Sequence, residues 1–120
     1  MPSDSRPRLQ LYGIRSCDSC RRALQWLQSN EVPHAFHDVR EEGLRGDLLQ
    51  GWLESPHGRV LLNRRSTTWR QLPQEMQGLA DRDPVGLLLQ YPTLMKRPVI
   101  TDGQVIVAVG FDPASLEASL

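Results

Sequence analysis

The chain has 120 residues, which is enough for one domain of ordinary size. Its hydrophobic fraction of 39% and charged fraction of 23% are typical of a folded globular protein and argue against disorder. Its formal net charge is zero, so overall charge gives no reason to expect direct binding to nucleic acid. The sequence contains neither the run of ~18 apolar residues that a membrane span needs nor the apolar segment of a secretory signal at its start. These features predict a cytoplasmic protein without a membrane partner.

The first third of the chain has the pattern of a strand–helix–strand unit. An apolar run over residues 8–14 predicts a strand, and apolar residues at helical spacing predict an amphipathic helix over residues 17–29. Ser16 is the expected N-cap of this helix and Asn30 its C-terminal stop. Residues 34–39 then predict a second strand. Such a unit places the two strands parallel, joined by a right-handed crossover.

The rest of the chain predicts a helical segment followed by a hairpin and a last helix. Apolar residues at helical spacing, interrupted by prolines, fill residues 41–95. Residues 98–101 and 105–111 flank Asp102-Gly103, a strong hairpin signal, and residues 113–120 predict a short helix. The fold class is therefore α/β: a thioredoxin-like β-α-β…β-β-α core with a mixed four-stranded sheet. We expect a single domain over residues 1–120, with a helical insertion at about 41–95.

The sequence Cys17-Asp18-Ser19-Cys20 forms a C-x-x-C motif, which in a cytosolic chain indicates redox chemistry or metal binding. A thiol in the first turn of a helix lies near the positive end of the helix dipole, which lowers its pKa. Arg15, Arg21 and Arg22 surround Cys17 and favour the same shift. Cys17 would then be the exposed attacking thiol and Cys20 the buried resolving thiol. The alternative is a pair of incidental cysteines, one of them on the core face of the helix.

A zinc site is the other chemistry that these cysteines allow, because His34 and His37 follow them. Zinc fingers place two histidines on a helix, three to five residues apart. Here the two histidines fall on a predicted strand and point to opposite faces. The sequence therefore predicts no metal ligands.

Two basic stretches are candidates for binding an anion. Arg64 lies in a run rich in Arg, Ser and Thr, and the guanidinium group suits carboxylates and oxyanions. A solvated loop explains this run equally well. Arg97 precedes Pro98, which opens a predicted strand; in a cis conformation that proline would lie against the C-x-x-C motif.

These motifs together resemble the arsenate reductase-like (ArsC/Spx/YffB) family. The resemblance spans most of residues 8–120 and is carried by the stretches 11–14, 17–27, 62–69, 92–98 and 109–111. It implies a thioredoxin-like core with a helical insertion. It also implies that Pro98 is cis and faces the active cysteine.

The resemblance to arsenate reductases themselves is incomplete. Those enzymes attack arsenate with one cysteine, which matches Cys17, and hold the oxyanion with three arginines. Arg97 matches one arginine; Asn63 occupies the position of the second, with Arg64 adjacent; and the third falls near residues 110–111, where there is no arginine. Losing one preorganised oxyanion donor costs about 10²–10³ in rate. We therefore predict negligible arsenate reduction.

Two other branches of the family resemble the chain in different stretches. The YffB-like branch, regarded as glutathione-dependent thiol reductases, matches residues 62–69 but usually lacks the second cysteine. The Spx-like branch of redox-switched regulators, which bind the RNA polymerase α subunit, matches residues 17–23 and has a glycine near Gly58.

Our prediction is a thiol–disulfide oxidoreductase with Cys17, Cys20 and Arg97 as catalytic residues. Asn63, Arg64 and Pro98 are the predicted substrate-binding residues. No cofactor is implied, but glutathione would be a co-substrate, and glutathione or glutaredoxin a partner. The alternative is an Spx-like regulator that binds RNA polymerase through a Cys17–Cys20 disulfide switch. A third hypothesis is a family member that has lost its chemistry and serves as an interaction domain.

Overall fold

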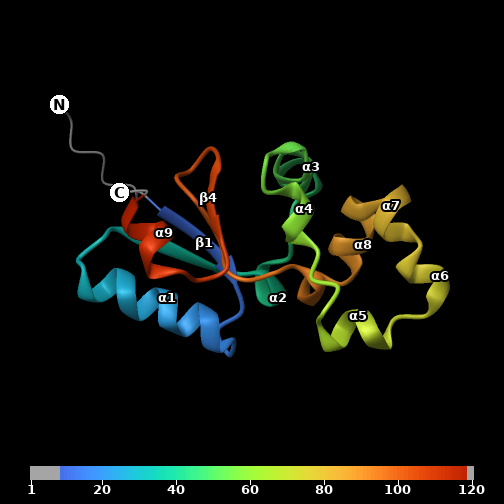
Figure 1. Cartoon of the computed structure of the whole chain (residues 1–120), viewed down its shortest axis with the longest axis horizontal. Helices are drawn as coiled ribbons and strands as arrows, with labels where there is room; N and C mark the ends of the chain where they lie inside the picture. The colour runs from blue at the N-terminus through green and yellow to red at the C-terminus, as the bar shows by residue number, and fades with distance from the viewer. Residues whose placement is uncertain (1–8, 119–120) are drawn as a thin grey trace. The chain divides into compact units, whose positions relative to one another are not determined.

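The structure is a computed structural model that describes residues 9–118. The chain divides into two compact units. The first, here the core unit, comprises the described parts of Met1–Asp38 and Arg97–Leu120, and the second, the helical unit, is Val39–Lys96. Figure 1 shows the strands with helices α1 and α9 in the core unit, and helices in the other unit. The helical segment expected at about 41–95 falls within the helical unit; that the whole chain is one domain remains a prediction.

The core unit contains one four-stranded mixed sheet, as predicted. The strands are β1 (Leu9–Gly13), β2 (His34–Asp38), β3 (Val99–Thr101) and β4 (Ile106–Val109), in the order β2-β1-β3-β4. Strand β1 runs parallel to β2 and antiparallel to β3, and β3 runs antiparallel to β4. Helix α1 (Asp18–Ser29) connects the parallel pair, and α9 (Pro113–Ala118) follows the hairpin. This is the mixed α/β arrangement that the alternation of strand and helix patterns predicted.

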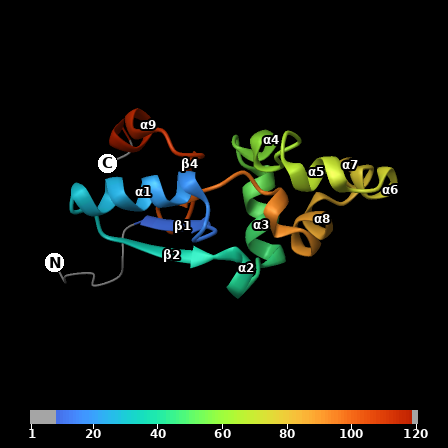
Figure 2. The same cartoon turned by 90° about the horizontal axis from the view of Figure 1, so that it is seen from below.

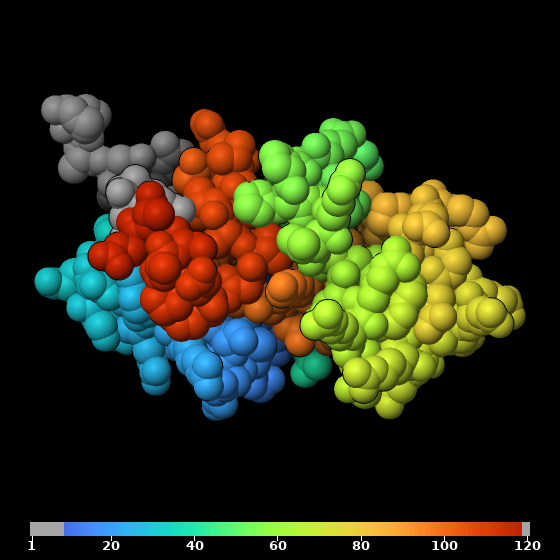
Figure 3. All heavy atoms as spheres, viewed as in Figure 1, coloured from blue at the N-terminus to red at the C-terminus, as the bar shows by residue number. Residues whose placement is uncertain are grey.

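The core of this unit lies between the sheet and the two helices. Alternate residues of β1 point to one face, and Ala23 and Leu27 of α1 meet them there. Leu116 of α9 joins the same cluster, and Figures 2 and 3 show α9 beside α1. The buried residues of the cluster are Leu9, Leu11, Ala23, Leu27, Ile100, Ala108 and Leu116. Packing on this face holds the start of α1 at the carboxyl end of β1.

The helical unit consists of short helices around a small core of its own. The elements are α2 (Val39–Glu42), α3 (Gly46–Glu54), α4 (Gly58–Leu61), α5 (Thr67–Gln71), α6 (Gln74–Gln77), α7 (Leu79–Arg82), α8 (Pro84–Gln90) and the 3₁₀ turn η1 (Pro92–Leu94). Side chains cap two of them: Ser66 accepts from the Trp69 amide, and Asp83 accepts from the Gly86 amide. The residues buried here include Leu49, Trp52, Leu61, Leu87, Leu88, Leu94 and Met95.

Several predicted boundaries were wrong by a residue or two. Cys17, and not Ser16, is the N-cap of α1, because its carbonyl accepts the first helical hydrogen bond, from the Arg21 amide at 3.0 Å. Val39 does not extend β2: it is buried and begins α2. The predicted first and last elements reach residues 8 and 119–120, which lie outside the described residues. Within residues 9–118 no helix is long and apolar enough to cross a membrane.

Candidate active site

Cys17 lies where the chain turns from β1 into α1. Its backbone is extended, with φ −77° and ψ 128°, as is typical of an N-cap residue. Its amide donates to the Ile14 carbonyl at 2.9 Å, which closes the turn between the strand and the helix. The side chain is half-buried. The sulfur therefore sits at the positive end of the α1 dipole, as the C-x-x-C pattern predicted.

Opposing effects act on the Cys17 sulfur, and the pKa of this thiol is lowered overall. Partial burial raises it. Hydrogen bonds from the Cys20 backbone, the Arg97 side chain and the Cys20 thiol lower it, as does the positive charge of Arg97. A negative sulfur is thus stabilised by groups that are already in place.

Cys20 has the opposite environment, one turn further along α1. Its side chain is fully buried, and burial raises the pKa of the Cys20 thiol to about 12. A backbone hydrogen bond from Ile14 and the charge of Arg97 oppose this rise, while the nearby Cys17 adds to it. At neutral pH Cys20 is therefore a thiol that donates a hydrogen bond to Cys17. Both cysteines are free in the structure.

The Cys20 sulfur occupies space that is available because Gly13, the last residue of β1, has no side chain. A Cβ atom placed on Gly13 would overlap the Cys20 Sγ, and would lie 3.5 Å from Cε1 of Phe36. A side chain at position 13 would therefore displace the sulfur. The local sequence does not indicate this role for Gly13, because its contact with Cys20 is made through the tertiary fold.

Arg97 and Pro98 reach this site from the opposite end of the core unit's sequence. They precede β3, the antiparallel neighbour of β1, so the sheet brings them to the end of β1 where Cys17 lies. The Arg97–Pro98 peptide bond is cis, as the resemblance implied. The Pro98 carbonyl accepts a hydrogen bond from the Gly110 amide at 2.8 Å. Arg97 hydrogen-bonds the Cys17 sulfur, which unites three predicted catalytic residues in one place.

The arginines that flank the motif in sequence have other partners in the structure. Asp18 lies 3.1 Å from the Nε of Arg22 and 3.7 Å from the guanidinium of Arg21, and all three side chains are well exposed. Arg15 places its guanidinium over the ring of Phe36. The cation that acts on Cys17 is Arg97, which the sequence separates from it by 80 positions.

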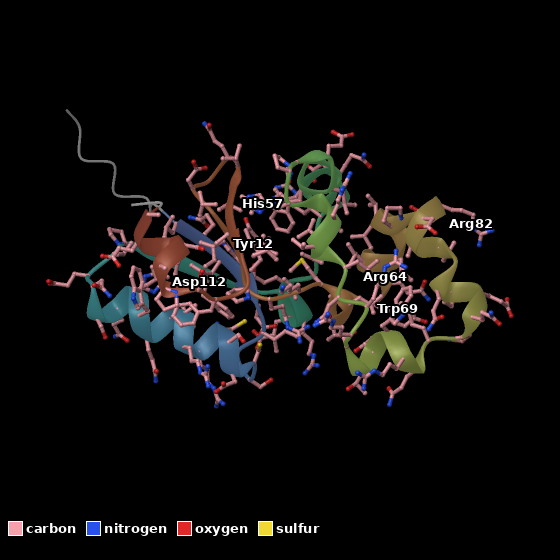
Figure 4. All side chains as sticks on the ribbon, in the orientation of Figure 1. Tyr12, His57, Arg64, Trp69, Arg82 and Asp112 are labelled. Carbon is pink, nitrogen blue, oxygen red and sulfur yellow. The ribbon has the colours of Figure 1, made fainter. Side chains whose placement is uncertain are left out.

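Asn63 and Arg64 belong to the helical unit and have local structural roles there. The Asn63 amide donates to the Leu94 carbonyl at 2.7 Å, and its side-chain oxygen accepts from the Arg65 amide at 3.1 Å. Arg64 lies over the ring of Trp69, as Figure 4 shows, and its guanidinium is 3.6 Å from Asp81. Their role as substrate-binding residues remains a prediction.

The histidines considered for zinc also have other partners. Nδ1 of His34 donates to the Val32 carbonyl at 2.8 Å. His37 hydrogen-bonds the Gln10 side chain at 2.6 Å and stacks on the ring of Tyr12, 4.8 Å between centroids. Over residues 9–118 no group of three or more His, Cys, Asp or Glu is arranged to hold a metal ion.

One buried polar residue near this site was not singled out from the sequence. Asp38 ends β2 beside Gly13 and is 3% exposed. Its Oδ2 atom accepts a hydrogen bond from the Arg15 backbone amide at 3.0 Å, in the turn that leads to Cys17. Parallel strands end at the same edge of a sheet, so the position of Asp38 at the end of the second predicted strand was the available signal.

Comparison with known proteins identifies the family. The model of the ArsC family matches residues 12–119. The chain is 35% identical to an uncharacterized protein of Haemophilus influenzae, over 92% of this chain and 97% of that protein. It is 30% identical to the global transcriptional regulator Spx 1 of Lactococcus lactis, over 93% and 88%.

Solved structures agree with this result. A structure named YFFB protein is 35% identical, with a TM-score of 0.85 over 93% of this chain and 98% of that one. An arsenate reductase (ArsC) related protein from Brucella melitensis is 36% identical, with a TM-score of 0.69 over 98% and 97%. The chain therefore belongs to the ArsC family.

Proposed function

We propose that this chain is a thiol–disulfide oxidoreductase in which Cys17 attacks and Cys20 resolves. The observation that carries the proposal is the contrast between the two sulfurs. Cys17 is accessible and receives hydrogen bonds that stabilise its thiolate, whereas Cys20 is buried and protonated next to it. This is the arrangement of an attacking and a resolving thiol.

The reaction proceeds in two exchanges. The Cys17 thiolate attacks one sulfur of a substrate disulfide, forms a mixed disulfide with it, and releases the other sulfur as a thiolate. Cys20 then loses its proton to the released thiolate or to water and attacks the Cys17 sulfur. The second substrate thiolate leaves, and a Cys17–Cys20 disulfide remains. Two electrons pass from the cysteine pair to the substrate, and two molecules of a thiol reductant such as glutathione restore the pair.

Arg97 stabilises the negative sulfur in this scheme. It contributes both a hydrogen bond and a positive charge to Cys17. When Cys17 becomes part of a disulfide, the same guanidinium is available for the departing thiolate or for a carboxylate of the thiol reductant. We propose that Asn63, Arg64 and Pro98 contribute to substrate binding, and that glutathione or glutaredoxin is the reducing partner.

Trapping of the mixed disulfide tests this proposal. A Cys20→Ser variant should accumulate Cys17-linked mixed disulfides with glutathione or with thiol proteins, because the resolving thiol is missing. A Cys17→Ser variant is the matched control and should trap none. Reduction of a glutathionylated peptide by the wild-type chain and glutathione should depend on Cys17. Equal trapping by both single variants, or no trapping by either, would contradict the proposal.

Arsenate reduction is a second activity to measure with the same chain. The chain offers Arg97 but no arginine at residues 110–111, and Phe111 packs against the core cluster. We expect negligible arsenate reduction with glutathione and glutaredoxin. Turnover close to that of an arsenate reductase would show that Arg64 or another group supplies the additional positive charge.

The second candidate function is a redox-switched regulator. It is supported by the C-x-x-C motif and by the 29–30% identity to proteins named global transcriptional regulator Spx. In that case the Cys17–Cys20 disulfide would change the affinity for the C-terminal domain of the RNA polymerase α subunit. Capture of that domain by the oxidised chain, reduced capture after dithiothreitol, and no response in Cys17→Ser would favour the regulator.

A further inference from the structure

Asp38 is a buried carboxylate that takes no part in the proposed exchanges between thiols and disulfides. It is the last residue of β2, it pairs in register with Gly13, and only 3% of it is exposed. A carboxylate is costly to remove from water unless hydrogen bonds or charges compensate it. A role for this residue should therefore be visible in what its oxygens bind.

The Asp38 carboxylate holds the turn that carries Cys17. Its Oδ2 accepts from the Arg15 amide at 3.0 Å, a contact between residues 23 positions apart. Arg15 lies between β1 and α1, in the segment where the Cys17 amide closes on the Ile14 carbonyl. A hydrogen bond within the turn and a hydrogen bond to the neighbouring strand thus help to fix it.

We propose that Asp38 is a positioning residue for Cys17. By anchoring the Arg15 amide, it keeps the Cys17 sulfur at the start of α1, within reach of the Cys20 amide and the Arg97 side chain. The inference rests on the proposed function only in taking Cys17 as the reactive thiol. Its test uses the ionisation of that thiol, so it holds or fails whether or not the chain proves to be a reductase.

A buried carboxylate that positions Cys17 would influence the thiol in two ways that differ in sign. Its negative charge would disfavour a thiolate, whereas its hydrogen bond to the Arg15 amide would preserve the geometry that favours one. Asp38→Asn removes the charge and keeps an oxygen acceptor for the Arg15 amide. Asp38→Ala removes both. The two variants therefore separate charge from positioning.

The experiment measures alkylation of Cys17 by iodoacetamide against pH, in the reduced and folded full-length chain. We expect Asp38→Asn to leave the apparent pKa of Cys17 unchanged or to lower it. Asp38→Ala should raise it and should slow alkylation near pH 7 by about threefold or more, as expected when a thiolate loses part of its helix-terminus and hydrogen-bond stabilisation. A Cys17 pKa that in both variants equals or lies below the wild-type value would overturn the proposal, because the hydrogen bond of Asp38 would then have no effect on the thiol.

A control variant separates positioning from a general loss of stability. Asp112 accepts from the Ala114 amide and the Ser115 hydroxyl at the start of α9. Asp112→Ala should lower the melting temperature and leave the Cys17 pH profile in place. If Asp38→Ala does not fold, amide hydrogen exchange in the wild type decides instead. Protection of the Arg15 amide supports the anchor, and exchange at the rate of an open loop overturns it.

Discussion

The difference in pKa between Cys17 and Cys20 predicts a large difference in their reactivity. The pKa of Cys20 is about 12, so only ~10⁻⁵ of this thiol is ionised at pH 7. The pKa of Cys17 lies below its ordinary value of 9.0, so more than ~10⁻² of it is ionised. Ionisation alone therefore favours Cys17 by at least about 10³. The more basic Cys20 thiolate is intrinsically the better nucleophile, by roughly 15- to 30-fold for a three-unit difference in pKa. Cys17 should still react at least about 30 times faster.

Timed alkylation of the reduced, folded protein at pH 7 measures this ratio. Trypsin places both cysteines on one peptide, residues 16–21, so fragment ions must distinguish the two alkylated forms. Unfolding in guanidinium provides the control, because the two rates should then converge. The variants Cys17→Ala and Cys20→Ala report each thiol alone. A ratio below about five in the folded state, or one that survives unfolding, would refute this account of the site.

Three further predictions concern the site and the fold. Arg97→Lys should raise the pKa of Cys17 with little loss of stability, because a flexible ammonium does not reproduce the planar guanidinium that hydrogen-bonds the sulfur. Arg97→Gln should raise the pKa further, because it also removes the positive charge. A rate–pH profile that neither variant moves would show that Arg97 does not act on the thiol. The free energy of unfolding should fall as pH rises from about 9 towards 12, because Cys20 in the folded chain retains a proton that it loses in the unfolded chain. The contribution of Cys17 to that free energy should instead fall as pH drops below 9. In Cys20→Ala the urea midpoint should no longer decline at alkaline pH, and a decline that persists would mean that another group causes it. Gly58→Ala should cost about 1–3 kcal/mol of unfolding free energy, because its Cβ would overlap the Leu53 carbonyl. Gly51→Ala, in open space on α3, should instead stabilise by about 0.5–1 kcal/mol, and similar denaturant midpoints for the two variants would contradict the packing argument.

The effect predicted at Gly58 bears on the choice between the two functions. Gly58 lies near the position of the glycine that the Spx-like branch uses to bind polymerase, so the Spx-like hypothesis invites a substitution here. The structure supplies a local reason for a glycine at this position, since any side chain would strike the backbone of Leu53. A substitution at Gly58 that abolishes partner binding would therefore need a stability measurement beside it. Polymerase binding by the oxidised and by the reduced chain distinguishes the two functions without a substitution at Gly58.

Local patterns in the sequence were sufficient to predict most of the elements. The spacing of apolar residues gave α1, the Asp102-Gly103 pair gave the hairpin, and the order of elements gave the mixed sheet. These features depend on neighbours within a few positions, so periodicity and turn chemistry are enough to reveal them. The short helices of the helical unit were harder to delimit. A helix of four or five residues has too few turns to show a period, and its ends depend on caps such as Ser66.

The candidate site likewise has features that the local sequence determines and features that only the tertiary structure decides. The C-x-x-C motif at a helix start is local, so the sequence by itself determined which thiol is exposed at the helix dipole and which lies one turn inside. The tertiary structure alone decided what surrounds them. It brings Arg97 to the Cys17 sulfur, whereas Arg21 and Arg22 pair with Asp18. It also packs Cys20 against Gly13 and hydrogen-bonds the turn before Cys17 to Asp38. The reason is that hydrogen bonds and desolvation act over a few ångströms in space, and the pairing of β1 with β2 and β3 sets those distances between residues far apart in the chain.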